Sequence, residues 1–294
     1  MKIPVLLDTD IGTDIDDALA LAYMLKQPEC ELLGITTVTG QPQIRAQLAD
    51  AVCRALGYND LPIHSGTDNP LKVPQRQTEA PQRTVLAKYP HKEDFKPNTA
   101  VDFLQQTIRA RPGEITLLTI GPLTNIAHLF NLDPQIPELL KQHVMMGGLY
   151  FDKALGYGQT EWNTSGDPHA TDFVFSHAVP KVYCIGLDVT TCCKMSADEC
   201  RKRFSKEPYQ IIGEMAEVWF DRRSEITFHD PLAAACIFEP LLCTFESGLV
   251  RVELQDGQKI GRTSFNPRQK QKPHQVAVDV NSDAFFKHYF DICR

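Results

Sequence analysis

The sequence has few of the features that place a chain in a membrane or on nucleic acid. None of its apolar runs approaches the ~20 residues that a membrane-spanning helix needs. The start, "MKIPVLLDTD", offers too few apolar residues for a signal peptide. Positive charge is also scarce, because 30 Lys and Arg residues stand against 37 Asp and Glu, a formal net charge of −7. We therefore expect no membrane and no nucleic-acid partner, and we interpret the short basic loop at 267–274 as solvated surface.

Cysteine is present but lacks any regular framework. The nine cysteines are scattered singly, apart from Cys192 and Cys193, and no C-x-x-C motif occurs. An odd count without regular spacing is typical of reduced thiols rather than of a disulfide scaffold. We therefore expect a soluble, cytoplasmic protein in which Cys192 and Cys193 are buried packing residues.

Strand-like and helix-like segments alternate along the chain. Hydrophobic residues make up 43% of it and charged residues 23%, which allows a large buried core. The predicted strands are 3–7, 31–38, 114–120, 142–148 and 181–190, and the predicted helices are 16–27, 43–56, 98–110 and 167–178. This alternation favours an α/β fold with a mostly parallel, Rossmann-like central sheet flanked by helices. Strands at 249–254 and 274–280 predict a small antiparallel C-terminal appendage, and no repeat or long linker divides the single domain expected over 1–294.

One stretch, "LLDTDIGTDIDDALALAY" at residues 6–23, is unusually acidic. It carries five aspartates within ten positions: Asp8, Asp10, Asp14, Asp16 and Asp17. Carboxylates this close repel one another and raise one another's pKa. A hard cation with oxygen ligands, Ca²⁺ or Mg²⁺, would neutralise the set. Because the cluster follows the first strand, it is expected at the carboxyl edge of the sheet, where α/β proteins bind ligands.

Helix capping is the simplest alternative explanation of the cluster. Asp14 would then be an N-cap, and Asp16 and Asp17 would interact with the dipole in the first helical turn. This explanation leaves Asp8 and Asp10 without a role, since both leave the strand on the same face.

The same stretch shares features with two known metal-binding patterns. An EF-hand loop starting at Asp8 fails, because position 19 is Leu rather than Glu. A Mg²⁺-dependent phosphatase of the haloacid-dehalogenase type, with Asp8 as nucleophile, stays an alternative. Its pattern has Thr two residues after the second Asp, where this chain has Gly12.

Three further motifs follow in order along the chain. They are "TIGPLTNIA" (119–127), "TEWNTSGDPHA" (160–170) and "ITFHDPLAAA" (226–235). Together with "DTDIGTDIDDALAL", "ITTVTG" (35–40) and "MMGG" (145–148), they resemble the inosine–uridine-preferring nucleoside hydrolases. The resemblance extends from residue 3 to about 240, and four motifs in the same order make it specific.

The resemblance implies a calcium site and a set of catalytic residues. Nucleoside hydrolases hold one Ca²⁺ and cleave the N-glycosidic bond of ribonucleosides, giving ribose and free base. The implied calcium ligands are Asp10, Asp17, Asp230 and the backbone carbonyl of Ile120. Asp10 would also be the general base and His229 would protonate or hydrogen-bond the leaving base, while Asp16, Glu161 and Asn163 would hold sugar hydroxyls.

Simpler structural roles exist for several of these residues. Glu161 and Asn163 could cap the helix that begins near Asp167. His229 could be a structural histidine, and Asp230 could be an N-cap that is followed by proline. The sequence alone leaves these alternatives open.

The sugar end of the implied site differs from the family pattern. Two asparagines of the family match Gln41 and Leu155 here, so that a longer amide and an apolar side chain replace two short amides. We still expect Gln41 to contact the substrate. Since an apolar wall discriminates only weakly between hydroxyl and hydrogen, we expect poor selectivity for the 5′-hydroxyl of the riboside.

The function predicted from the sequence is therefore Ca²⁺-dependent hydrolysis of nucleosides or related ribosides, in purine or pyrimidine salvage. The resemblance also implies a homodimer or homotetramer. A catalytically idle nucleoside- or sugar-binding protein is the second alternative, after the phosphatase. The pairing of Asp10 with His229 argues against it, because a binding protein has no need of proton-handling groups.

Overall fold

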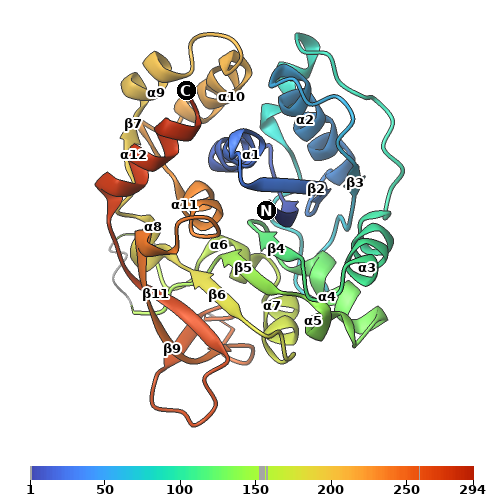
Figure 1. Ribbon diagram of the computed structural model, residues 1–294, viewed down its shortest axis with the longest axis vertical. Coiled ribbons are helices and arrows are strands. Elements are labelled where there is room, and N and C mark those ends of the chain that lie inside the picture. The colour runs from blue at the N-terminus through green and yellow to red at the C-terminus, as the bar shows by residue number, and fades with distance from the viewer. Residues whose placement is uncertain (1, 152–155, 157, 258) are drawn as a thin grey trace.

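The computed structural model describes residues 2–151, 156, 158–257 and 259–294. Within these residues, nine strands form one sheet in the order β10-β9-β11-β6-β5-β4-β1-β2-β3 (Figure 1). The strands are β1 (Ile3–Thr9), β2 (Cys30–Thr37), β3 (Ile63–Ser65), β4 (Thr116–Thr119), β5 (Gln142–Met146), β6 (Val182–Ile185), β9 (Cys243–Val252), β10 (Thr263–Asn266) and β11 (His274–Val280). Neighbours from β3 to β11 run parallel, and β9 runs antiparallel to both β11 and β10. The predicted α/β fold is confirmed, and the antiparallel C-terminal strands extend the main sheet at one edge.

Helices cover both faces of the sheet. One layer contains α1 (Asp16–Lys26), α2 (Pro42–Ala55), α11 (His229–Ala235) and α12 (Ser282–Ile292), which pack against one another. The other contains α3 (Ala100–Ala110), α4 (Thr124–Leu132), α5 (Ile136–Leu139) and α7 (Pro168–Phe175). Figure 1 shows these layers on opposite sides of the central strands. In the described part of the chain, no helix is long and apolar enough to cross a membrane.

Shorter elements complete the fold around the C-terminal half. They are α6 (Trp162–Gly166), α8 (Leu187–Thr190), α9 (Ala197–Arg203), α10 (Gln210–Phe220), the 3₁₀ turns η1 (Pro81–Ala87) and η2 (Pro240–Leu242), and a two-stranded antiparallel sheet of β7 (Lys194–Ser196) and β8 (Glu225–Thr227). The α10 helix packs against η1 and α2, so it lies above the same sheet edge as the acidic stretch.

The central strand β1 is buried on both faces. Val5 and Leu7 belong to the core beneath α1 and α11, whereas Leu6 belongs to the core beneath α4, and all three are fully buried. This alternation follows from the two-residue period of a strand. It also places Asp8, two residues after Leu6, on the α4 side of the sheet.

Two predictions about local structure are wrong. The apolar run 181–190 was expected to be one strand, but β6 ends at Ile185 and α8 follows from Leu187 to Thr190. A backbone hydrogen bond of 2.9 Å from Leu187 N to Gly148 O turns the chain there, so tertiary contacts override the strand propensity of the run. Cys192 was expected to be buried, but it lies exposed in the turn after α8, while Cys193 is buried as predicted.

Candidate active site

A cavity of about 460 Å³ lies at the carboxyl edge of the parallel strands. Four of its lining residues end or follow consecutive strands of the sheet: Asp10 after β1, Ile120 after β4, Met146 at the end of β5 and Leu187 after β6. Ligands of α/β proteins bind at this edge. The volume is within the range of small-molecule sites.

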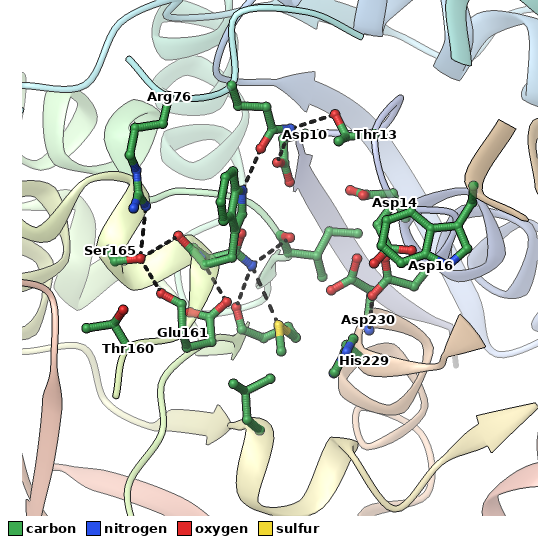
Figure 2. A pocket seen from close by; sticks show the side chains of 18 of the residues that line it. Asp10, Thr13, Asp14, Asp16, Arg76, Thr160, Glu161, Ser165, His229 and Asp230 are labelled. Atoms are coloured by element: carbon green, nitrogen blue, oxygen red, sulfur yellow. Dashed lines mark hydrogen bonds between the residues drawn. The ribbon is translucent and has the colours of Figure 1, made fainter. Parts of the chain in front are cut away.

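Three buried carboxylates meet on one side of the cavity. One carboxylate oxygen from each of Asp16, Asp17 and Asp230 lies within 4.8 Å of the others. Burial raises the pKa of all three, and the neighbouring carboxylates raise it further. Figure 2 shows Asp16 and Asp230 close together on one side of the cavity, with Asp14 nearby. Buried carboxylate oxygens are the donor set that a hard divalent cation prefers.

The starts of two helices bring these carboxylates together. Asp16 and Asp17 are the first residues of α1, and Asp230 is the second residue of α11. The Asp16 carboxylate accepts a hydrogen bond of 3.4 Å from the backbone N–H of Asp230, and Asp17 accepts one from the Thr9 hydroxyl. Phe228 is at the N-cap of α11, so the interpretation of Asp230 as an N-cap is wrong.

Asp10 lines the same cavity but lies outside the group of three. Its Oδ2 accepts a hydrogen bond of 3.0 Å from Gln77 Nε2. Burial raises the pKa of the Asp10 carboxyl, and the nearby Arg45 guanidinium opposes this. A Cβ atom on Gly121 would lie 2.8 Å from Asp10 Oδ1, which explains why the "GPLTN" turn begins with glycine.

A fully buried arginine holds the loops around Asp10. Arg45, on α2, is 0% exposed and donates to the carbonyls of Asp10 and Ile11 after β1, with 3.1 Å to the latter. It also donates to Gly40 O at 2.8 Å and to Glu79 O at 3.2 Å. Since every one of these carbonyls belongs to a loop at the carboxyl edge, Arg45 fixes three loops at once.

Asp8 does not reach the cavity. Its side chain is buried on the α4 side of the sheet and accepts a hydrogen bond of 2.7 Å from Asn125 Nδ2 on α4, and another from the Thr36 hydroxyl on β2 at 2.5 Å. Burial raises its pKa to about 7. The phosphatase alternative requires Asp8 as an accessible nucleophile. Asp8 is instead buried away from the cavity, so the geometry argues against this alternative.

Asp14 lines the cavity without capping a helix. The N-cap position of α1 is Ile15, which forms no side-chain cap, so the interpretation of Asp14 as an N-cap is wrong. The Oδ1 atom of Asp14 instead accepts a hydrogen bond of 2.6 Å from the backbone N–H of Ile15. Burial raises the pKa of Asp14 to about 7.

Glu161 lies on the opposite side of the cavity from Asp16 and Asp230 (Figure 2), and Asn163 lines the same cavity. The Glu161 carboxylate accepts hydrogen bonds from the backbone N–H groups of Asn163, Thr164 and Gly148, at 2.7, 2.9 and 3.0 Å. Glu161 therefore caps α6, whereas the next helix, α7, is capped by Asp167.

The side chain of Asn163 connects two strand ends. Its Nδ2 donates to the backbone carbonyls of Ile120 and Met146, at 3.0 and 3.2 Å. The carbonyl of Ile120, expected as a calcium ligand, thus borders the cavity and already accepts one hydrogen bond. A carbonyl oxygen has two lone pairs, so this bond leaves it able to accept a second partner.

His229, the first residue of α11, points into the cavity below Asp230 (Figure 2). Its Nδ1 lies 2.7 Å from the Thr190 hydroxyl. Burial lowers the pKa of the imidazole to about 4, so His229 is neutral at pH 7. A neutral imidazole held at one nitrogen can present the other to a ligand.

Gln41 and Leu155 are the two residues that match the family's asparagines at the sugar end. Gln41 is absent from the lining, and its Oε1 accepts a hydrogen bond of 3.1 Å from the backbone N–H of Ala80. Leu155 lies outside the described residues.

Sequence reasoning also missed several lining residues. They are Thr13, Arg76, Gln77, Thr160, Trp162, Ser165, Trp219 and Arg223. Most lie in loops or at helix ends without hydrophobic periodicity, so a pattern search has nothing to detect. The chain has only two tryptophans, and both line the cavity, which is a signal that composition alone could have suggested.

Comparison with known proteins agrees with this geometry. The chain matches the family described as "Inosine-uridine preferring nucleoside hydrolase" over residues 5–287. It is 31% identical to uridine nucleosidase 1 of Arabidopsis thaliana, over 88% of this chain and 80% of that protein. It is also 31% identical to the non-specific ribonucleoside hydrolase RihC of Shigella dysenteriae, over 97% and 96%. A solved plant nucleoside hydrolase, PpNRh1, superimposes with a TM-score of 0.87 at 27% identity, over 100% of this chain and 99% of that one.

These similarities place the site in a known class of enzyme, the hydrolases of N-glycosidic bonds. The chain belongs to the inosine–uridine-preferring nucleoside hydrolase family. The family predicted from the sequence is thus confirmed.

Proposed function

We propose that the protein is a Ca²⁺-dependent nucleoside hydrolase that releases ribose and a free base. The observation that carries the proposal is the group of buried carboxylates, Asp16, Asp17 and Asp230, in a cavity that also contains Asp10 and His229. The residues present fit a calcium ion, because their ligand atoms are carboxylate oxygens and burial makes their mutual repulsion costly without a cation. When bound, the ion would supply a positive charge that orients the ribose diol and acidifies a water molecule.

The chain's own residues have distinct tasks in this proposal. Cleavage of the N-glycosidic bond passes through a state with positive charge on the sugar and negative charge on the base. Asp10, held in place by Gln77, accepts the proton of the attacking water. Asp16 binds the ribose diol, and Glu161 and Asn163 border the other sugar hydroxyls.

His229 acts on the leaving base. Because burial lowers its pKa to about 4, His229 carries no extra proton at pH 7. We therefore assign it hydrogen bonding to the departing base rather than storage of a proton. The contact with Thr190 at 2.7 Å engages Nδ1, so we assign the hydrogen bond with the departing base to Nε2.

Uridine is the first substrate to test. One relative is named as a uridine nucleosidase and another as a non-specific ribonucleoside hydrolase. The experiment is a panel of purine and pyrimidine nucleosides assayed for free ribose, with Ca²⁺ and after chelation. We expect ribose release that chelation abolishes and Ca²⁺ restores. Release of phosphate from phosphate esters, without release of ribose from any nucleoside, would contradict the proposal.

The setting of the enzyme is part of the same proposal. We propose a cytoplasmic homodimer or homotetramer, active in nucleoside salvage, whose residues 1–294 form one domain. The main sheet supports the single domain, since it takes β1 from the start of the chain and β11 from near its end. The nine free cysteines support a reducing compartment. Light scattering on the purified protein measures the oligomeric state.

A further inference from the structure

Gln77 turns inward from an otherwise exposed loop. Its neighbours Arg76, Thr78 and Glu79 are exposed, whereas Gln77 is only 8% exposed. It belongs to the long segment between β3 and α3, which has no helix or strand from Gly66 to Ala80. An inward polar side chain on such a loop needs partners, because buried amide groups are costly without hydrogen bonds.

The amide of Gln77 finds those partners in the cavity. Its Nε2 donates to Asp10 Oδ2 at 3.0 Å and to Thr13 Oγ1 at 2.8 Å. Its Oε1 accepts a hydrogen bond of 2.5 Å from the indole Nε1 of Trp162. Figure 2 shows Asp10 and Thr13 together at this end of the cavity, and the dashed lines to them mark the two hydrogen bonds that the Gln77 amide donates. One side chain therefore links the proposed general base to a tryptophan 85 positions further along the chain.

The backbone of Gln77 is placed independently of its side chain. A Cβ atom on Gly40 would lie only 2.0 Å from Gln77 O, so the loop packs directly onto the turn after β2. The backbone N–H of Gln77 also donates to Gln75 Oε1 at 2.8 Å. Any side chain at Gly40 would therefore displace the backbone of Gln77 from its present position.

Trp162 forms part of the sugar side of the cavity. It lies between Glu161 and Asn163 at the start of α6 and is 49% exposed. The Arg76 guanidinium lies 4.9 Å from the centre of its ring, a cation–π contact. The orientation of the indole is thus fixed by two neighbours in one loop, Arg76 at its face and Gln77 at its edge.

We propose that Gln77 is a positioning residue of the hydrolase, which sets the Asp10 carboxylate and the Trp162 indole in one arrangement. Gln77 acts through Asp10 rather than on the substrate: its N–H group holds Oδ2 of Asp10 in a fixed orientation. The same amide holds the tryptophan wall, so the general base and the sugar side of the cavity are aligned together. The inference rests on the proposed function, in which Asp10 accepts the proton of the attacking water.

Two substitutions separate the contact of Gln77 with Asp10 from its contact with Trp162. Gln77→Ala removes both contacts. Gln77→Glu keeps an oxygen for the Trp162 N–H but replaces the donor that faces Asp10 by a second carboxylate. Loss of a hydrogen bond to a charged group changes a rate constant roughly ten- to a hundredfold. We therefore expect kcat to fall by roughly that factor in both variants. Melting temperatures should stay close to that of the wild type.

The matched control is Gln105→Ala. Gln105 lies on α3 and donates through Nε2 to Asp133 Oδ2 at 2.8 Å, the same type of bond far from the cavity. The substitution and the lost contact are alike, so a general effect of removing a glutamine would show there too. We expect wild-type kcat and KM in this variant.

Tryptophan emission gives a readout that does not depend on turnover. In a Trp219→Phe background, Trp162 is the remaining tryptophan. Gln77→Ala should shift its emission to the red, because the indole N–H then bonds to water, whereas Gln77→Glu should not. Gly40→Ala should reproduce the Gln77→Ala shift and its loss of kcat, since it displaces the same loop.

The outcomes are distinct. Lower kcat in both Gln77 variants, with an emission shift in Gln77→Ala alone, supports the proposal. Wild-type turnover in either variant, equal emission from both, or a loss of kcat that only follows loss of folded protein overturns it. A wild type that releases no ribose from any nucleoside defeats the proposed function, and this inference with it. An active wild type with an equally active Gln77→Ala variant defeats this inference alone.

Discussion

The carboxylates near the end of β1 are balanced by different partners. Asp8 accepts hydrogen bonds from Asn125 and from the Thr36 hydroxyl. Asp10 accepts one from Gln77 in the cavity. Asp17 lies in the group of three that suits a cation. Each carboxylate is therefore expected to respond to a different change, which makes single substitutions informative.

Asp10→Asn should lower kcat by roughly a hundredfold or more while the protein stays folded. The amide can still occupy the same space, but it cannot accept the proton of the attacking water, and a positioned base contributes about 10²–10⁴-fold. Steady-state kinetics and a thermal melt measure both quantities. Unchanged turnover would assign the base to another carboxylate, with Asp14 the next candidate.

His229→Ala should separate substrates by their leaving groups. A nucleoside needs help as its base departs with negative charge, whereas p-nitrophenolate departs without a proton. We expect a large loss of kcat/KM on uridine or inosine and a small loss on p-nitrophenyl riboside. Equal losses on both substrates would indicate that His229, with its contact to Thr190, serves only the structure.

Removal of the 5′-hydroxyl from the substrate should matter little. Gln41, which matches a sugar-binding asparagine of the family, is held by Ala80 outside the cavity lining. We expect kcat/KM for 5′-deoxyinosine to lie within about tenfold of that for inosine. A preference of ~10⁴-fold for inosine, as a dedicated hydroxyl site produces, would show that another residue binds this group.

At the scale of elements, the proposed metal site is a junction of two helix starts. The first turn of α1 supplies Asp16 and Asp17, and the first turn of α11 supplies Asp230. The positive end of a helix dipole favours carboxylates there. The residual repulsion between the two turns is what a divalent cation would remove.

Calcium should stabilise the protein more at pH 7.5 than at pH 5.5. Burial and mutual repulsion raise the pKa of Asp16, Asp17 and Asp230, so protons compete with the metal as the pH falls. An ion that binds only the folded state raises the melting temperature. Thermal melts of chelated protein, with and without Ca²⁺ at both pH values, measure this. The same shift at both values, or no shift at either, would argue against a calcium site beside these three carboxylates.

Elements with a clear local pattern could be predicted from the sequence. The run at 16–27 is α1 to within one residue, and the apolar strand at 3–7 extends only two residues further, to Thr9. Local composition decides such segments: the run at 16–27 is rich in the helix formers Ala, Leu and Met, and the short apolar run at 3–7 is typical of a strand that is buried on both faces. The α8 helix could not be predicted, since a contact with Gly148 rather than the run itself sets its conformation.

The site was predictable only where a motif carries it. Asp16, Asp17, Asp230 and His229 lie in recognisable stretches, and the structure brings all four to one cavity. Gln77 has no motif, because its position depends on Gly40, far away in the sequence. Loop geometry of this kind follows from packing between distant segments, which a single sequence does not display.

At the scale of the whole molecule, the large parallel sheet buries titratable groups far from the cavity. His143, on β5, is fully buried, and its Nε2 lies 2.9 Å from the Thr119 hydroxyl on β4. In the described part of the chain its Nδ1 has no hydrogen-bond partner. Burial lowers the pKa of His143 to about 3. The fold therefore holds a neutral histidine in a place that cannot easily accept a proton.

This histidine should make the protein sensitive to acid. In the unfolded chain His143 takes up a proton near pH 6.5, whereas the folded protein resists it down to about pH 3, so the free energy of unfolding falls as the pH drops through that window. Between pH 7 and pH 4.5 we expect His143 to account for a loss of about 2 kcal/mol. His143→Gln removes the titrating group, so its dependence on pH should be shallower than that of the wild type by this amount. The exposed His128 on α4 provides the control, because His128→Gln changes a side chain that is in water in both states. Urea unfolding of metal-free protein at the two pH values measures all three, and parallel curves for wild type and His143→Gln would exclude His143 as the source of the acid sensitivity.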